Sequence, residues 1–150
     1  MMNKHDEHCK EIAKTLEQYA SGEYFEYYGD LLPIDPDDEF WNESDEYKYY
    51  LADDGYYYYE INGEKIEESE VEPASMYDYF NDIFDINYIL DSNREFEAVR
   101  VMIACGGPNI YINTWDKCVE LHWWSEHGKA WLSTELCDKI NSFFDELYNC

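Results

Sequence analysis

Apolar side chains recur at helical spacing at both ends of the chain. In residues 1–22 the positions that share one face are Cys9, Ile12, Ala13, Leu16, Tyr19 and Ala20. Near the other end, Ser133 or Thr134 is suited to cap a helix, whose apolar stripe is Leu136, Ile140, Phe143, Phe144 and Leu147. Spacings of three and four residues bring such positions together on a helix. The pattern therefore predicts an N-terminal and a C-terminal helix, each with one buried face.

Runs of β-type residues predict strands between these helices. Residues 46–52 and 56–61 flank Asp54-Gly55, a dipeptide that favours a tight hairpin turn because both central positions need positive φ. A further meander of three strands is expected over 96–104, 110–114 and 118–124. A short helix is expected over 74–84, and the acidic segment 64–72 is expected to be exposed.

The order of these elements indicates an α+β fold. We expect an antiparallel sheet, made of a hairpin plus a three-stranded meander, backed by the N- and C-terminal helices. A length of 150 residues is typical of one domain. We therefore expect a single domain over 1–150, with an acidic, tyrosine-rich region at 23–97 and a meander-plus-helix scaffold at 98–150.

Charge is the least ordinary property of the chain. It has 35 acidic and 10 basic residues, a formal net charge of −25. Residues 23–97 hold 24 of the acids and three bases, whereas 98–150 are almost balanced. Because like charges repel, direct binding to nucleic acid or to an anionic membrane is disfavoured, and a basic protein surface is the expected partner. Halophilic adaptation predicts acidity over the whole surface, which the balanced last third contradicts.

The cysteines and the termini indicate an intracellular protein. There are five cysteines, an odd number, and none has CxxC spacing. The polar start does not resemble a signal peptide, and no apolar run approaches the ~18 residues of a membrane span. We expect reduced thiols and a cytoplasmic location. The alternating Trp123 and Trp124 leave both a monomer and a dimer open.

The acids and tyrosines of the middle region form the expected partner-binding surface. Its acidic members are Asp35, Asp37, Asp38, Glu39, Glu43, Asp45, Glu46, Asp53, Asp54, Glu64, Glu67, Glu68, Glu70, Glu72, Asp78, Asp82 and Asp85. Its aromatic members are Tyr47, Tyr49, Tyr57 and Tyr59. Exposed tyrosine beside carboxylate suits contact with arginine, since the ring adds apolar area and stacks under a guanidinium group.

Carboxylates held on a folded domain can substitute for phosphates. Duplex DNA carries one charge per ~1.7 Å of axis, so the net −21 of residues 23–97 matches about 36 Å of duplex. Carboxylates two residues apart on a strand are ~6.6 Å apart, close to the spacing of neighbouring phosphates. A groove that holds nucleic acid through its backbone would accept such a surface.

In size, in its exposed tyrosines and in the acidic blocks Asp35-Pro36-Asp37-Asp38-Glu39 and 64–72, the chain resembles the small acidic proteins of phages and mobile elements that mimic DNA. The resemblance implies inhibition of a host defence enzyme, a restriction enzyme or a CRISPR nuclease, by occupation of its nucleic-acid groove. The segment 99–109 also looks like part of a mobile-element family to which no activity can be attached.

Two other classes of function stay open. The chain could be an immunity or antitoxin protein against a basic nuclease toxin, or an acidic enzyme or carbohydrate-binding domain. Metal-binding residue types occur at His5, His8 and Cys9 and at His122 and His127, but the first group lies near a terminus and the second lacks further ligands at suitable spacing. We interpret these as surface histidines and expect no metal, no cofactor and no catalytic residues.

Overall fold

The structure is a computed structural model that describes residues 3–150, without the side chain of Asn42. Its contacts divide the chain into two compact units. One, the helix–sheet unit, contains the N-terminal segment to Ala20 together with Ser75–Cys150; the other, the acidic unit, is Ser21–Ala74. The division differs from the expected one, because the boundary lies at residue 74 and not at 97, and because the first helix belongs with the C-terminal part.

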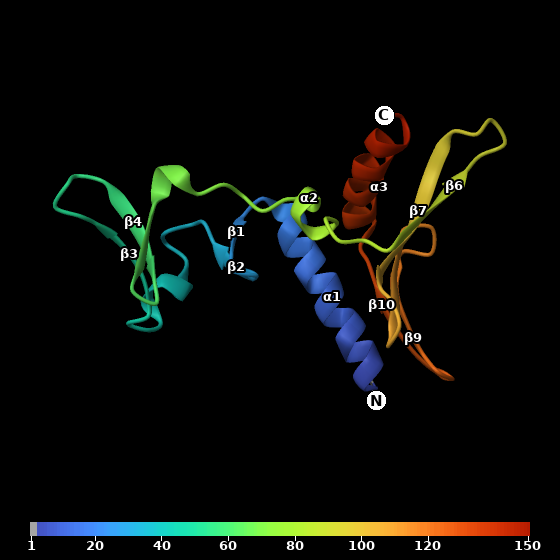
Figure 1. The fold of residues 1–150 in the computed structure, drawn as a ribbon, viewed down its shortest axis with the longest axis horizontal. Coiled ribbons are helices and arrows are strands. Elements are labelled where there is room, and N and C mark those ends of the chain that lie inside the picture. Colours follow the sequence, from blue (N-terminus) through green and yellow to red (C-terminus); the bar gives the residue numbers. More distant parts are fainter. Residues whose placement is uncertain (1–2) are drawn as a thin grey trace. The chain divides into compact units, whose positions relative to one another are not determined.

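The helix–sheet unit contains a five-stranded antiparallel sheet and three helices (Figure 1). The helices are α1 (Lys4–Ser21, whose last residue lies just past the unit's boundary), the short α2 (Met76–Tyr79) and α3 (Thr134–Tyr148). The strands are β6 (Asp85–Leu90), β7 (Phe96–Ala104), β8 (Asn109–Asn113), β9 (Cys118–Trp123) and β10 (Glu126–Trp131). They neighbour one another in chain order, so the sheet is a simple meander.

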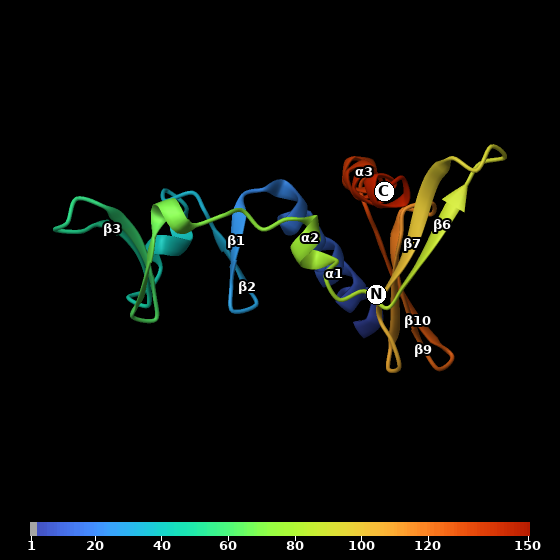
Figure 2. The same cartoon turned by 45° about the horizontal axis from the view of Figure 1, so that its top comes forward.

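Both long helices cover the same face of this sheet, as Figures 1 and 2 show. Alternate strand residues such as Val101, Ile112 and Leu121 are fully buried against Leu16 of α1 and Ile140 of α3. Burying each such side chain contributes roughly 1.5–3 kcal/mol. The same alternation sends the intervening residues to the opposite face, which the helices leave open.

The start of α1 lies directly against the edge strand β10. A Cβ on Gly128 would come within 2.5 Å of the His5 backbone, so only glycine permits this approach. The backbone N–H of Lys129 donates to Asp6 Oδ1 at 2.9 Å. Since an uncovered edge strand invites pairing with other chains, this contact protects the end of the sheet.

The acidic unit is built from two small antiparallel sheets and an aromatic core. A hairpin joins β1 (Tyr24–Tyr27) and β2 (Asp30–Pro33), and the second sheet contains β3 (Tyr47–Leu51), β4 (Tyr57–Ile61) and β5 (Glu64–Glu67), with short 3-10 turns at Glu39–Asn42 and Glu68–Glu70. Its hydrophobic core cluster contains the buried residues Phe25, Leu32, Trp41, Tyr59 and Ile61. The indole N–H of Trp41 donates to the Pro33 carbonyl at 3.1 Å, so the ring is held at both its apolar body and its polar edge.

The α+β class, the two terminal helices and the predicted strands are confirmed, but the sheets are larger than expected. The meander has five strands, three of them predicted; β6 and β10 are additional. Segment 64–72 contributes β5, since Asn62 and Gly63 both have positive φ and turn the chain back onto β4. The helix expected over 74–84 is confined to α2, and the chain already contacts β7 at Phe84, whose N–H donates to the Met102 carbonyl at 2.9 Å.

Candidate functional site

The acidic unit carries its charge almost entirely on its surface. Residues 21–74 contain 18 acids and two lysines, a net charge of −16. Sixteen of these acids are exposed, and the other two, Glu60 and Glu67, are partly buried. The core beneath them is aromatic and aliphatic, so it does not neutralise the surface field.

Within the described residues the carboxylates of this unit form no ion pair, although, after the hydrogen bond from Tyr58, the charge of Lys65 helps to lower the pKa of Asp54. In the part of the chain that the structure describes, every ion pair within 4.0 Å belongs to the helix–sheet unit. Lys65 instead lies over the rings of Tyr50 and Tyr58, 5.9 Å from each centroid. The negative field is therefore mostly unbalanced by nearby charges.

Some acids of the predicted surface also have local structural roles. Asp35 accepts from the N–H of Asp37, and Asp38 caps a 3-10 turn by accepting from the N–H of Phe40. The Tyr58 hydroxyl donates to Asp54 at 2.5 Å, which lowers the pKa of Asp54 and raises that of Tyr58 to about 12. These acids are partly committed to the fold of their own loops.

Glu68 is the other acid of the unit that accepts a side-chain hydrogen bond, from the Tyr49 hydroxyl at 2.6 Å. Ten predicted acids of the unit accept no hydrogen bond within the described residues, which leaves them free to meet a partner. They are Asp37, Glu39, Glu43, Asp45, Glu46, Asp53, Glu64, Glu67, Glu70 and Glu72.

The last three predicted acids lie outside the acidic unit. Asp78, Asp82 and Asp85 belong to the helix–sheet unit. Asp78 forms a capping box with Ser75 at the start of α2, accepting from its backbone N–H at 2.8 Å. The structure thus brings fourteen of the seventeen predicted acids into one compact unit and separates these three from it.

The predicted tyrosines lie on the inner face of the β3–β4 pair. Tyr59 is fully buried and its hydroxyl donates to the Ile34 carbonyl, so its assignment to an exposed contact surface is wrong. Tyr47 and Tyr49 are partly buried beside it, and Tyr57 is 47% exposed. The reason is strand parity: side chains two apart share a face, and that face is anchored in the core by Tyr59 and Ile61.

Other aromatic rings of the acidic unit take the exposed positions. Tyr28 is 85% exposed and Tyr56 is 58% exposed, and both lie in turns next to acidic residues. The outer face of the sheet pairs Tyr50 with Tyr58. Sequence alternation defines these two sets of tyrosines, but does not decide which set faces the core.

A second polar site, which the sequence analysis missed, covers the open face of the five-stranded sheet. Arg100 on β7 donates to both carboxylate oxygens of Glu120 on β9, at 3.1 and 3.2 Å. Its guanidinium carbon is 3.6 Å from the centroid of the Tyr111 ring. Asn113 donates to the same carboxylate at 2.8 Å. Burial raises the pKa of Glu120, but hydrogen bonds from Arg100, Asn113 and His122 outweigh it and lower the pKa to about 2.

Two histidines extend this network toward the edge of the sheet. His122 Nε2 is 3.2 Å from Glu120 Oε1, and His122 Nδ1 is 3.0 Å from His127 Nδ1. The two residues are direct cross-strand partners on β9 and β10. In the sequence, polar residues alternate with core residues along β9. This alternation could have indicated the polar face, but the neighbours of its residues follow only once β10 is known to pair with β9.

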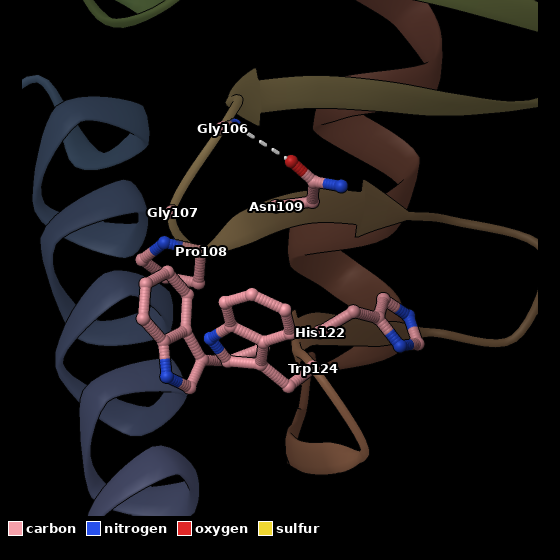
Figure 3. A pocket seen from close by; sticks show the side chains of 7 residues that line it. Gly106, Gly107, Pro108, Asn109, His122 and Trp124 are labelled. Carbon is pink, nitrogen blue, oxygen red and sulfur yellow. Dashed lines mark hydrogen bonds between the residues drawn. The ribbon is translucent and has the colours of Figure 1, made fainter.

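A shallow pocket of about 230 Å³ lies at the β7–β8 turn beside this network (Figure 3). The turn is closed by the N–H of Gly106, which donates to Asn109 Oδ1 at 2.8 Å, and it joins the antiparallel strands β7 and β8. A Cβ on Gly107 would lie 2.6 Å from the Trp123 ring, so glycine allows the indole to pack there. Trp124 is 86% exposed, and the His122 ring points away from it.

Three further findings concern metal sites, membrane spans and similarity to known proteins. Among residues 3–150, no three or more His, Cys, Asp or Glu side chains are arranged to hold a metal ion. The same residues include no helix long and apolar enough to cross a membrane. Comparison with protein-family models, curated proteins and solved structures finds no match to this chain. The case for a function therefore depends on the chain's own residues.

Proposed function

We propose that the chain is an acidic nucleic-acid mimic that inhibits a DNA- or RNA-binding host defence enzyme by occupying its basic groove. The observation that carries the proposal is the acidic unit: a compact segment with net charge −16, whose carboxylates are exposed and form no ion pair in the described chain. A restriction enzyme or a CRISPR nuclease is the expected class of partner.

The charge of this unit matches nucleic acid in density as well as in sign. At one charge per ~1.7 Å, a net charge of −16 corresponds to about 27 Å of duplex axis. A compact segment of 54 residues has a radius of gyration of about 10 Å and a diameter of about 26 Å. The unit therefore offers a basic groove as much charge as the length of duplex that it would displace.

Solubility does not account for so much unpaired charge. A net charge of about 2–8 is sufficient to keep a small domain soluble. Each further pair of carboxylates ~7 Å apart costs about 0.6 kcal/mol of repulsion in water. An aromatic core that includes Trp41, Phe25 and Tyr59 offsets this cost, and a cationic partner would remove it.

Displacement of nucleic acid tests the proposal. Labelled duplex is bound to a purified restriction enzyme or CRISPR nuclease, and the full chain is titrated in while fluorescence anisotropy is followed. We expect release of the duplex at ~0.1 M salt and much weaker release at ~0.5 M, because the contacts are screened. The chain alone should not shift the anisotropy of free duplex. Binding of the chain to duplex itself, or displacement that is unaffected by salt, would contradict mimicry.

A further inference from the structure

His122 and His127 form a pair on the open face of the sheet and have no role in the proposed function. The Nδ1 atoms of His122 and His127 face each other at 3.0 Å across β9 and β10. The two rings are 5.1 Å apart between centroids and inclined at 77°. Both residues lie in the helix–sheet unit, so a role for the pair does not depend on the acidic unit.

Hydrogen bonding defines which nitrogen of His122 carries a proton. Both oxygens of Glu120 accept from the Arg100 guanidinium, and one also accepts from Asn113, so the carboxylate acts as an acceptor here. His122 must then donate from Nε2 to Glu120, over 3.2 Å. In the neutral ring this leaves a lone pair on Nδ1, aimed at His127 Nδ1.

Metal-binding histidines donate one ring N–H to a carboxylate and bind the metal through the other ring nitrogen; in His122 that other nitrogen, Nδ1, accepts a hydrogen bond from His127 Nδ1. The carboxylate orients the ring and makes the other nitrogen a better ligand. Glu120 is itself fixed from two further strands, by Arg100 of β7 and Asn113 of β8. The Nδ1 atom of His122 is thus preorganised rather than free to rotate.

We propose that His122 and His127 chelate a divalent transition-metal cation, Cu²⁺ or Ni²⁺, through their two Nδ1 atoms. The cation would replace the hydrogen bond that His127 Nδ1–H donates to His122 Nδ1, and His127 would then carry its proton on Nε2, which leaves a lone pair on each Nδ1 atom. Since no third His, Cys, Asp or Glu side chain joins them in the described residues, water completes the coordination. Imidazole suits these cations, whereas Mg²⁺ and Ca²⁺ prefer oxygen ligands.

The separation of the two nitrogens indicates the coordination geometry. With metal–nitrogen bonds of ~2.0–2.1 Å, a 3.0 Å separation corresponds to an angle of about 94° at the metal. That angle is close to the right angle between neighbouring ligands in tetragonal Cu²⁺ and Ni²⁺ sites. A tetrahedral Zn²⁺ site would need the nitrogens about 3.3 Å apart. The 3.0 Å separation is nearer to the ~2.9 Å that a right angle at the metal requires.

The test is titration of the untagged full chain with Ni²⁺ alone and with Cu²⁺ alone. Excess Mg²⁺ is present throughout to occupy surface carboxylates, and Cys105→Ser and Cys150→Ser remove the two exposed thiols. Calorimetry should give one equivalent of bound metal. The Cu²⁺ complex should show nitrogen hyperfine coupling in electron paramagnetic resonance.

Three variants assign the site. His127→Gln should weaken Ni²⁺ binding at least tenfold, whereas His8→Gln, at an exposed histidine of α1, should leave it unchanged. Glu120→Gln tests the positioning role and should weaken binding roughly 10- to 100-fold while the fold is retained by circular dichroism. Ni²⁺ binding of equal strength in the folded His127→Gln variant, or no binding by the parent chain, would overturn the proposal.

Discussion

Charge reversal within the acidic unit tests the partner-binding surface most directly. Asp37, Glu43 and Asp45 are exposed, and their carboxylates accept no hydrogen bond within the described residues. Asp35 and Asp38 are left unchanged because they hold the N–H groups of their own loop. Replacing the three acids by lysine changes the net charge of the unit from −16 to −10.

The expected loss of affinity follows from the number of contacts. Each exposed ion pair contributes about 0.2–1 kcal/mol, and the variant converts three attractions into repulsions of similar size. Affinity for a basic groove should fall by about 1–6 kcal/mol, which is roughly 10-fold at the lower end of that range. Folding stability should not fall, because the substitutions remove repulsion between like charges and leave the core of Trp41 and Tyr59 unchanged.

A matched control makes the same change of charge in the helix–sheet unit. Glu17, Asp138 and Glu146 are exposed helical acids, and their replacement by lysine also alters the net charge by six. Both triple variants are compared in the duplex-displacement assay and by thermal melting. If the control loses activity while the acidic-unit variant keeps it, the contact surface has been assigned to the wrong unit.

Two further predictions concern the helix–sheet unit. Gly128→Ala should destabilise the chain by about 1–3 kcal/mol, because its Cβ would meet the His5 backbone at 2.5 Å. The measurement is the melting temperature. Gly55→Ala is the comparison for backbone strain alone, since a Cβ at Gly55 meets no atom within 4 Å while the position has a positive φ. Glu120, whose pKa is lowered from 4.5 to about 2, should contribute stability that is present above pH 4.5 and is lost as the pH falls toward 2. Glu120→Gln should therefore flatten the dependence of the unfolding free energy on pH between 4.5 and 2. An unchanged slope would show that Glu120 is not the group responsible.

The sequence predicted those elements whose signals are local. Both terminal helices and the strand at Phe96–Ala104 were expected from apolar periodicity and are present. β10 was missed because it contains Gly128 and charged residues, and because its turn uses Trp124 at positive φ instead of an Asn-Gly pair. Without β10, His127 has no defined neighbour, so the sequence grouped it with His122 by residue type alone and could not place the two rings in contact.

Strand parity explains the error at the predicted contact surface. The run Tyr56–Tyr59 divides into two faces by alternation alone, but the choice of inner face depends on packing with Phe25 and Trp41, which come from earlier segments of the chain. The acids were easier to place, because a carboxylate without a partner is almost always exposed. Their exposure was predictable, whereas the division of the chain at residue 74, which separates Asp78, Asp82 and Asp85 from the rest, was not.

The contrast between the two units argues that the unpaired charge serves binding. The helix–sheet unit contains ion pairs: Arg100 with Glu120, and Lys139 with Glu135 one helical turn away. In the acidic unit, Lys48 and Lys65 flank Glu60 in the register of the sheet, yet no ion pair forms within the described residues, and the remaining acids have no lysine to meet. A composition set by salt adaptation alone would act on both units in the same way. The chain instead carries a net charge of −16 over the 54 residues of the acidic unit and −9 over the 96 residues of the helix–sheet unit, an uneven distribution that suits a surface which meets cations of another molecule.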